Sequence, residues 1–306
     1  MNEIIHDSEL NTQSSIWGRI IRIIIAYIII VGLFQYIGLD IIGVKFDSLE
    51  NIKNLSINQH LFLNFIGFVT TVLIVFLFRK SVDKKTIISM GFSITNISKD
   101  LLLGFCISLI LLGLGTVFIL LFTQSKIAFS LFNHNYFIKS FLLFVIVSLN
   151  EELFFRGYIL NNLLTLGKKY KALILSSVIF ALFHALNPNL SLLAFVNIFL
   201  AGLLLGSSYI FNQNLWFPIS LHLFWNFLQG AVFGYAVSGQ KLDAVFALHT
   251  SGENYLHGGE FGFEGSFICT VLVSLTVLTI FIFYSKNTAT FRHTQLKTEK
   301  SVLNRN

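Results

Sequence analysis

Charged residues are scarce in this chain of 306 residues, where aspartate, glutamate, lysine and arginine together make up 12%. An ordinary soluble domain contains about 25% of such residues. Hydrophobic residues account for 55% of the chain, and its mean hydropathy is +0.76. This balance is not that of a soluble domain, and it indicates a protein of the membrane.

Cysteine is equally scarce, and both residues, Cys106 and Cys269, fall in or beside long apolar runs. No CxxC spacing is present, so we interpret them as small apolar residues and not as a disulfide or metal framework. The sequence also lacks a repeat of fixed period, a heptad run and a low-complexity tract. These absences favour a single integral membrane domain over residues 1–306, with a flexible cytoplasmic tail at about 285–306.

Long apolar runs are abundant, and a helix of about 18 to 25 such residues can cross a bilayer. We therefore expect an all-α, polytopic membrane protein with about eight transmembrane helices. The eight candidate spans lie at approximately 19–39, 61–78, 101–122, 137–166, 171–186, 190–211, 215–237 and 266–284.

Lysine and arginine are distributed unequally over the ends and loops of these spans. One set of loops and ends carries fifteen of them and the opposite set carries five. Basic residues are retained on the cytoplasmic side, so both termini are expected in the cytoplasm of a multi-pass cell-membrane protein. The net charge of +6 reflects this bias and forms no concentrated basic face, which predicts a lipid bilayer as partner and no nucleic acid.

Three ionisable residues, Glu151, Glu152 and Arg156, lie within the fourth expected span. A charge at the bilayer centre costs about 2.5 to 3.5 kcal/mol, so each needs a reason. Glu152 and Arg156 are four residues apart and share a helix face, where they can pair. Glu151 points about 100° away. A carboxylate without such a partner can take up a proton near neutral pH, which makes Glu151 the candidate base.

Two further spans carry polar residues, namely His184 in the fifth and His222 with Asn226 in the seventh. Helical rise places Glu151, His184 and His222 at similar depths, so the three can share one level in the membrane. Such a set fits hydrolysis in which glutamate activates water and histidine or asparagine donates to the oxyanion. Two histidines and a glutamate are equally an acceptable zinc set, although the HExxH motif of soluble metalloproteases is absent.

The same residues form three separated motifs, EExxxR (151–156), FxxxH (180–184) and HxxxN (222–226). In order and spacing they resemble the CPBP family of intramembrane endopeptidases, which includes type II CAAX prenyl proteases and bacteriocin-processing or self-immunity proteins. The resemblance covers about Phe137 to Gly234. It implies a CAAX-protease-like catalytic bundle that acts on membrane-associated or lipidated protein and peptide substrates.

By this resemblance, Glu151 would activate the water, His184 would assist it, and His222 with Asn226 would form the oxyanion site. Glu152 and Arg156 would hold the motif in place, and Phe180 would pack beside it. Family members are described as metalloproteases and as glutamate-type enzymes. Zinc bound by Glu151, His184 and His222 and a metal-free glutamate mechanism therefore both remain open.

Two other functions also use polar residues inside a membrane. A proton-coupled transporter needs intramembrane Glu and His, but transporters commonly show repeated halves, which are not evident here. A non-catalytic immunity or scaffold protein would bind a membrane partner, yet it has no need of an unpaired glutamate in lipid.

Three further features of the sequence concern helix packing and solvent exposure. Gly202 and Gly206 are four residues apart and predict close helix packing. The glycine-rich connection 238–265, which includes Glu264, is expected to be a solvated loop and not a metal site. His60 is expected to face solvent.

Overall fold

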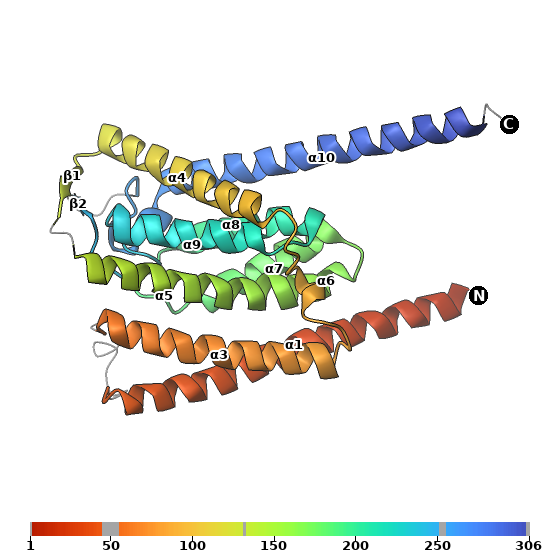
Figure 1. The fold of residues 1–306 in the computed structure, drawn as a ribbon, viewed down its shortest axis with the longest axis horizontal. Coiled ribbons are helices and arrows are strands. Elements are labelled where there is room, and N and C mark those ends of the chain that lie inside the picture. Colours follow the sequence, from red (N-terminus) through yellow and green to blue (C-terminus); the bar gives the residue numbers. More distant parts are fainter. Residues whose placement is uncertain (1, 45–54, 131–132, 251–254, 304–306) are drawn as a thin grey trace.

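The computed structural model describes residues 2–44, 55–130, 133–250 and 255–303. Side chains are described over 15–44, 55–130, 133–250, 255–284 and 286. Helices dominate the described chain (Figure 1), and the protein is an all-α, polytopic membrane protein, as the sequence predicts.

The elements follow one another with short connections. The α-helices are α1 (Asn2–Ile41), α3 (Ile57–Ser81), α4 (Ile97–Phe122), α5 (His134–Glu152), α6 (Asn161–Leu164), α7 (Lys169–Phe183), α8 (Leu192–Asn212), α9 (Trp216–Phe227) and α10 (Phe267–Leu303). The π-helices η2 (Leu153–Leu160) and η3 (Leu228–Val232) continue α5 and α9. The 3-10 turns are η1 (Ile88–Met90), η4 (Gly259–Phe261) and η5 (Phe263–Gly265).

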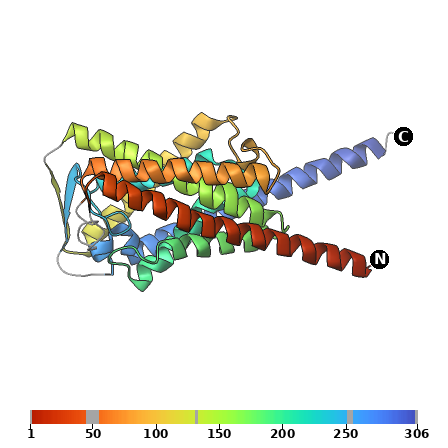
Figure 2. The ribbon, with the colours of Figure 1, turned by 90° about the horizontal axis from the view of Figure 1, so that it is seen from below.

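The helices pack lengthwise into one bundle (Figure 1). α1 packs on α3, α3 on α5, α5 on α9 and α9 on α4, while α8 packs on both α7 and α10. An antiparallel pair of strands, β1 (Lys126–Phe129) and β2 (Phe246–His249), lies at one end of the bundle, with Lys126 opposite His249. Figure 2 shows that the N- and C-terminal helices both extend from the opposite end.

Five of the described helices are long and apolar enough to cross a membrane, namely Ser15–Ile41, Ile57–Ser81, Ile97–Phe122, Leu192–Asn212 and Phe267–Tyr284. They correspond to the first, second, third, sixth and eighth expected spans. Of the other three, α7 and α9 have only 15 and 12 residues, and α5 ends in the polar residues of the fourth span. The count of eight therefore stays a prediction.

The final helix continues past its membrane-length part as far as Leu303. It thus passes through the segment expected to be a tail, 285–306, whose side chains lie outside the described residues apart from Lys286. The flexibility of this segment stays a prediction.

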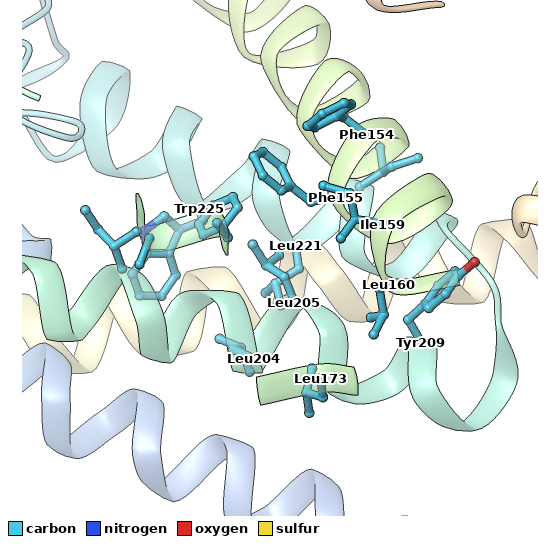
Figure 3. Packing of buried hydrophobic residues seen from close by; sticks show 14 of the residues in the cluster. Phe154, Phe155, Ile159, Leu160, Leu173, Leu204, Leu205, Tyr209, Leu221 and Trp225 are labelled. Atoms are coloured by element: carbon cyan, nitrogen blue, oxygen red, sulfur yellow. The ribbon is translucent and has the colours of Figure 1, made fainter. Parts of the chain in front are cut away.

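The membrane-length helices divide into outer and inner ones. In α1 only 17% of the most apolar window is buried within the protein, whereas in α8 the share is 61%. All eight residues of η2 are buried as well. Side chains from η2, α7, α8 and α9 gather into one apolar core, among them Phe155, Leu173, Leu205 and Leu221 (Figure 3). The core is therefore centred on the helices that carry the three motifs.

Close approach of helix backbones holds this inner group together, because lipid tails are as apolar as leucine and provide little hydrophobic drive for association. A Cβ atom on Gly202 would lie 2.9 Å from the Cα atom of Ser177, and one on Gly206 would lie 2.5 Å from a methyl of Leu173. The packing role predicted for these glycines is confirmed, and α8 lies directly against α7.

A buried polar cluster fastens α3 to α6 away from the three motifs. Arg79, with a side chain only 1% exposed, pairs with Asp83 at 3.1 Å and donates to Asn161 at 3.0 Å. Tyr158 and Asn162 also donate to Asp83. Arg79 is one of the fifteen basic residues counted above at the loops and ends on the expected cytoplasmic side. Its charge is instead neutralised inside the protein, because Asp83 lies four residues further along the chain and pairs with it.

Candidate active site

The first motif lies where the fourth expected span changes its helical form. Glu151 and Glu152 are the last residues of α5, and Arg156 lies in the π-helix η2 that follows. π-Helical turns are rare and often occur at functional sites. This change of form was not predicted from the sequence.

The predicted pairing within this motif is present. Arg156 Nη1 donates to Glu152 Oε1 at 2.8 Å, and both side chains are buried. Arg156 also donates to the carbonyl of Gly202 at 3.2 Å, and its guanidinium lies 4.5 Å from the centre of the Phe180 ring. Arg156 therefore ties the first motif to α7 and α8, and a buried pair of this kind depends on both partners.

The third motif is attached to the first through the same carboxylate. His222 Nδ1 lies 2.8 Å from Glu152 Oε1. A carboxylate paired with arginine only accepts, so Nδ1–H of His222 is the donor. This bond fixes the ring and leaves Nε2 directed at Glu151, with Nε2 at 3.8 Å from Glu151 Oε2. Glu152 thus orients His222 in addition to pairing with Arg156, a link that the sequence reading missed.

The second motif is oriented by the main chain. His184 follows α7 directly, and its Nδ1 donates to the carbonyl of Phe180 at 2.8 Å. Its Nε2 lies 3.8 Å from Glu151 Oε2. Both histidines therefore turn the same ring nitrogen towards the same carboxylate oxygen.

Glu151 Oε2 is buried and accepts no hydrogen bond from the described residues. A separation of 3.8 Å is too long for a direct hydrogen bond, and polar groups at such a spacing are commonly bridged by water. The arrangement can hold one water molecule against a carboxylate and two imidazoles.

Glu151, His184 and His222 are also the predicted zinc ligands. Hydrogen bonding of Nδ1 to a carboxylate or carbonyl, as in His222 and His184, is typical of metal-bound histidine. However, no group of three or more His, Cys, Asp or Glu side chains within the described ranges is arranged to hold a metal ion. Zinc at this centre therefore stays a prediction, and the described side chains alone can carry the hydrolytic chemistry.

A cavity of about 340 Å³ encloses this centre. Glu151, Phe180, His184, His222 and Asn226 all line it, whereas Glu152 and Arg156 are not among its lining residues. Asn226 is buried, and its side-chain amide makes no hydrogen bond with the described residues. The candidate site residues from the three motifs therefore come together around one enclosed space, with the ion pair behind it.

Polar residues outside the three motifs also line the cavity. Tyr27 comes from α1, His60 and Asn64 come from α3, and Glu264 comes from η5. The expectation that His60 faces solvent was wrong, because α3 packs against α5 and turns this side chain towards the cavity. No local spacing in the sequence relates these residues to the motifs, so they could not be found from it.

The glycine-rich connection 238–265 also differs from its prediction. Its residues 261–265 are buried against the bundle, and Glu264 is only 8% exposed. The loop was expected to be solvated. It is instead part of the cavity wall, because Asn197 of α8 donates to the backbone carbonyl of Glu264 at 2.7 Å. Glu253 lies outside the described residues.

Comparison with known proteins gives one match. Residues 133–228 match the family model described as type II CAAX prenyl endopeptidase Rce1-like. No curated protein and no solved structure matches the chain. The matched segment contains all three motifs and all seven residues singled out in them. This part of the chain is thus similar to type II CAAX prenyl endopeptidases, and the family resemblance predicted from the motifs is confirmed.

Proposed function

We propose that this protein is an intramembrane endopeptidase that hydrolyses peptide bonds of membrane-associated or lipidated protein and peptide substrates. The Rce1-like match supports an endopeptidase of the CAAX type in general. The observation that carries the residue assignment is the convergence of His184 Nε2 and His222 Nε2 on Glu151 Oε2, each at 3.8 Å, inside the cavity.

Glu151 acts as the general base in this proposal. Its Oε2 has no hydrogen-bond donor among the described residues, so it can accept a proton from a bound water. His184 assists, because its Nδ1–H is committed to the Phe180 carbonyl and the neutral ring then offers Nε2 as an acceptor. The water oxygen attacks the peptide carbonyl carbon while its proton passes to Glu151.

His222 and Asn226 stabilise the oxyanion that forms on the carbonyl oxygen. Asn226 supplies its amide N–H groups, which no described residue uses. His222 donates from Nε2 when its ring is protonated, and the Glu152 carboxylate at Nδ1 stabilises that imidazolium. The proton held by Glu151 then passes to the leaving amine as the carbon–nitrogen bond breaks, which restores the carboxylate.

The proposed substrates are peptides that lie at a membrane. Prenylated CAAX proteins, leader-bearing peptides, bacteriocins and membrane-anchored regulators all present an extended peptide beside a membrane. A cavity lined mostly by apolar side chains, with a few convergent polar groups, suits such an occupant.

We also propose that both termini lie in the cytoplasm. The terminal helices extend from the same end of the bundle (Figure 1), and the exposed Lys80 lies in the last turn of α3 near that end. Basic flanks of short loops favour the cytoplasmic side.

The decisive experiment replaces Glu151 by glutamine, which keeps the size of the side chain and removes the base. Purified protein in detergent is incubated with a panel of farnesylated and leader-bearing peptides, and cleavage is read by mass spectrometry. We expect the wild type to cut at least one peptide and Glu151→Gln to cut none, with insertion and thermal stability retained.

The exposed carboxylate of Glu260 provides the matched control, and Glu260→Gln should cut like the wild type. Unchanged cleavage by Glu151→Gln would reject the role of Glu151. Ion or solute flux in liposomes that depends on Glu151, with no cleavage, would instead support the transporter.

A further inference from the structure

Glu264 is a buried carboxylate that the proposed chemistry does not use. It lies in η5, immediately before α10, and its residue is only 8% exposed. It lines the same cavity as Glu151, although 113 positions separate the two in the chain. A buried charge without a cationic partner is unfavourable, so its presence in the wall needs an explanation.

The carboxylate is held by three neutral donors. Trp225 Nε1–H donates to Oε1 at 3.0 Å, and Ser238 donates to Oε2 from its backbone N–H at 3.0 Å and from its hydroxyl at 3.1 Å. This is the set of contacts that an ionised carboxylate accepts. No lysine, arginine or histidine of the described chain forms an ion pair with it, so its negative charge is not compensated there.

The backbone of this segment is also attached to the bundle by contacts that do not involve the carboxylate. Asn197 of α8 donates to the backbone carbonyls of Glu264, at 2.7 Å, and Ser266, at 2.8 Å. The Asn197 side chain is itself fixed by the hydroxyl of Thr270 at 2.7 Å. The main chain of η5 is thus anchored by an amide, and the carboxylate is available for an occupant of the cavity.

The electrostatic character of the cavity indicates what that occupant carries. Glu151 and Glu264 line it, and no lysine or arginine does so among the described residues. The guanidinium of Arg156 lies against the lining residue Phe180 and is paired with Glu152. A carboxylate that is shielded from water, as Glu264 is, attracts a cation more strongly than an exposed carboxylate does.

We propose that Glu264 is a specificity-determining residue that binds a basic side chain, lysine or arginine, of the peptide substrate. The inference rests on the proposed endopeptidase function and adds a charge preference to it. One lone pair of Oε1 remains beyond the bond from Trp225, which gives the ammonium or guanidinium group a place to donate. Trp225 lies one turn beyond His222 on α9, so the basic residue binds beside the scissile bond.

The test uses pairs of farnesylated peptides that are identical except for lysine or the neutral isostere norleucine at one position near the cleaved bond. Affinity is measured by fluorescence anisotropy in detergent on the Glu151→Gln variant, which holds the peptide without cutting it. At one position we expect lysine to bind about tenfold tighter or more than norleucine. Adding Glu264→Gln should abolish this difference, with the norleucine affinity unchanged.

Two variants separate charge from structure. Glu264→Asp retains the carboxylate and should restore part of the lysine preference, whereas Glu260→Gln on the same connection should leave it intact. An equal loss of affinity for both peptides in Glu264→Gln would overturn the proposal in favour of a structural role. Absence of a lysine preference at every position tested would also overturn it, and this comparison needs no variant of Glu264.

The outcomes for the two proposals are distinct. Peptides that bind with a Glu264-dependent lysine preference but are never cut by the wild type support the charge assignment and contradict the endopeptidase function. Peptides that are cut by the wild type with equal efficiency, whether they carry lysine or norleucine, support the endopeptidase and contradict the role of Glu264.

Discussion

Glu152 has two roles, because it pairs with Arg156 and also orients His222, and only the pairing was predicted from the sequence. It pairs with Arg156 at 2.8 Å and accepts from His222 at 2.8 Å through the same oxygen, Oε1. The ion pair therefore does more than balance a charge in the membrane, because it also sets the ring orientation of a residue at the cavity. Loss of this carboxylate should affect both folding and chemistry.

Glu152→Ala is expected to lower the free energy of unfolding by about 3 to 5 kcal/mol, because it leaves Arg156 buried without its carboxylate. Thermal denaturation and the yield of folded protein in detergent measure the effect. Glu151→Ala is the matched control and should lose much less, since no arginine depends on Glu151. Normal stability of Glu152→Ala would contradict this division of roles.

Replacement of Asn226 should lower catalysis and leave the stability of the fold nearly unchanged. Its amide has no hydrogen-bond partner among the described residues, so Asn226→Ala should change stability by less than about 1 kcal/mol. Loss of one oxyanion donor lowers kcat by about 10² to 10³. Steady-state kinetics on a cleaved peptide test this, and a rise in KM with unchanged kcat would place Asn226 in substrate binding alone.

At the scale of the element, the approach of α8 to α7 determines where Arg156 finds its acceptor, because the carbonyl of Gly202 receives one of its N–H groups. A side chain at Gly202 would press on the backbone of Ser177. The packing of two helices and the position of the buried ion pair are thus one structural feature.

Gly202→Val is therefore expected to destabilise the protein by about 1 to 3 kcal/mol or more, since the Gly202 backbone cannot yield without moving the carbonyl that accepts from Arg156. Gly113 of α4 is the control, because a Cβ atom there would meet nothing within 4 Å. Detergent melting of Gly202→Val and Gly113→Val provides the comparison, and equal melting temperatures would show that the close approach is unimportant.

The features that could be predicted from the sequence are those that depend on neighbours along one helix. The Glu152–Arg156 pair and the small faces of Gly202 and Gly206 follow from a spacing of four residues. The contact from Glu152 to His222 spans 70 positions, and no local rule encodes it. The roles of Glu264 and His60 in the cavity wall were missed for the same reason, since each depends on how separate helices dock.

Across the whole molecule, the described ends of the chain and the paired strands mark opposite faces of the membrane domain. Lys286 lies beyond the last membrane-length segment and Lys241 lies in the connection near the strands, and both are exposed. The proposed topology places position 286 in the cytoplasm and position 241 outside it.

Cysteines introduced as Lys286→Cys and Lys241→Cys test this arrangement with a membrane-impermeant maleimide. On intact cells only position 241 should be labelled, and position 286 should react after lysis. Unchanged protein, with its native Cys106 and Cys269, gives the background. Labelling of position 286 on intact cells would reverse the orientation.

The cavity wall is assembled from two parts of the chain, the segment 133–228 and residues outside it. The residues that would break the bond belong to segment 133–228, whereas Tyr27, His60 and Glu264 come from outside it. The proposed catalytic residues therefore lie in one stretch of the chain, and part of the wall around the substrate comes from outside it. Transplanting the outer helices and the 255–265 turn from a relative should exchange the preferred peptide while leaving the hydrolytic centre untouched.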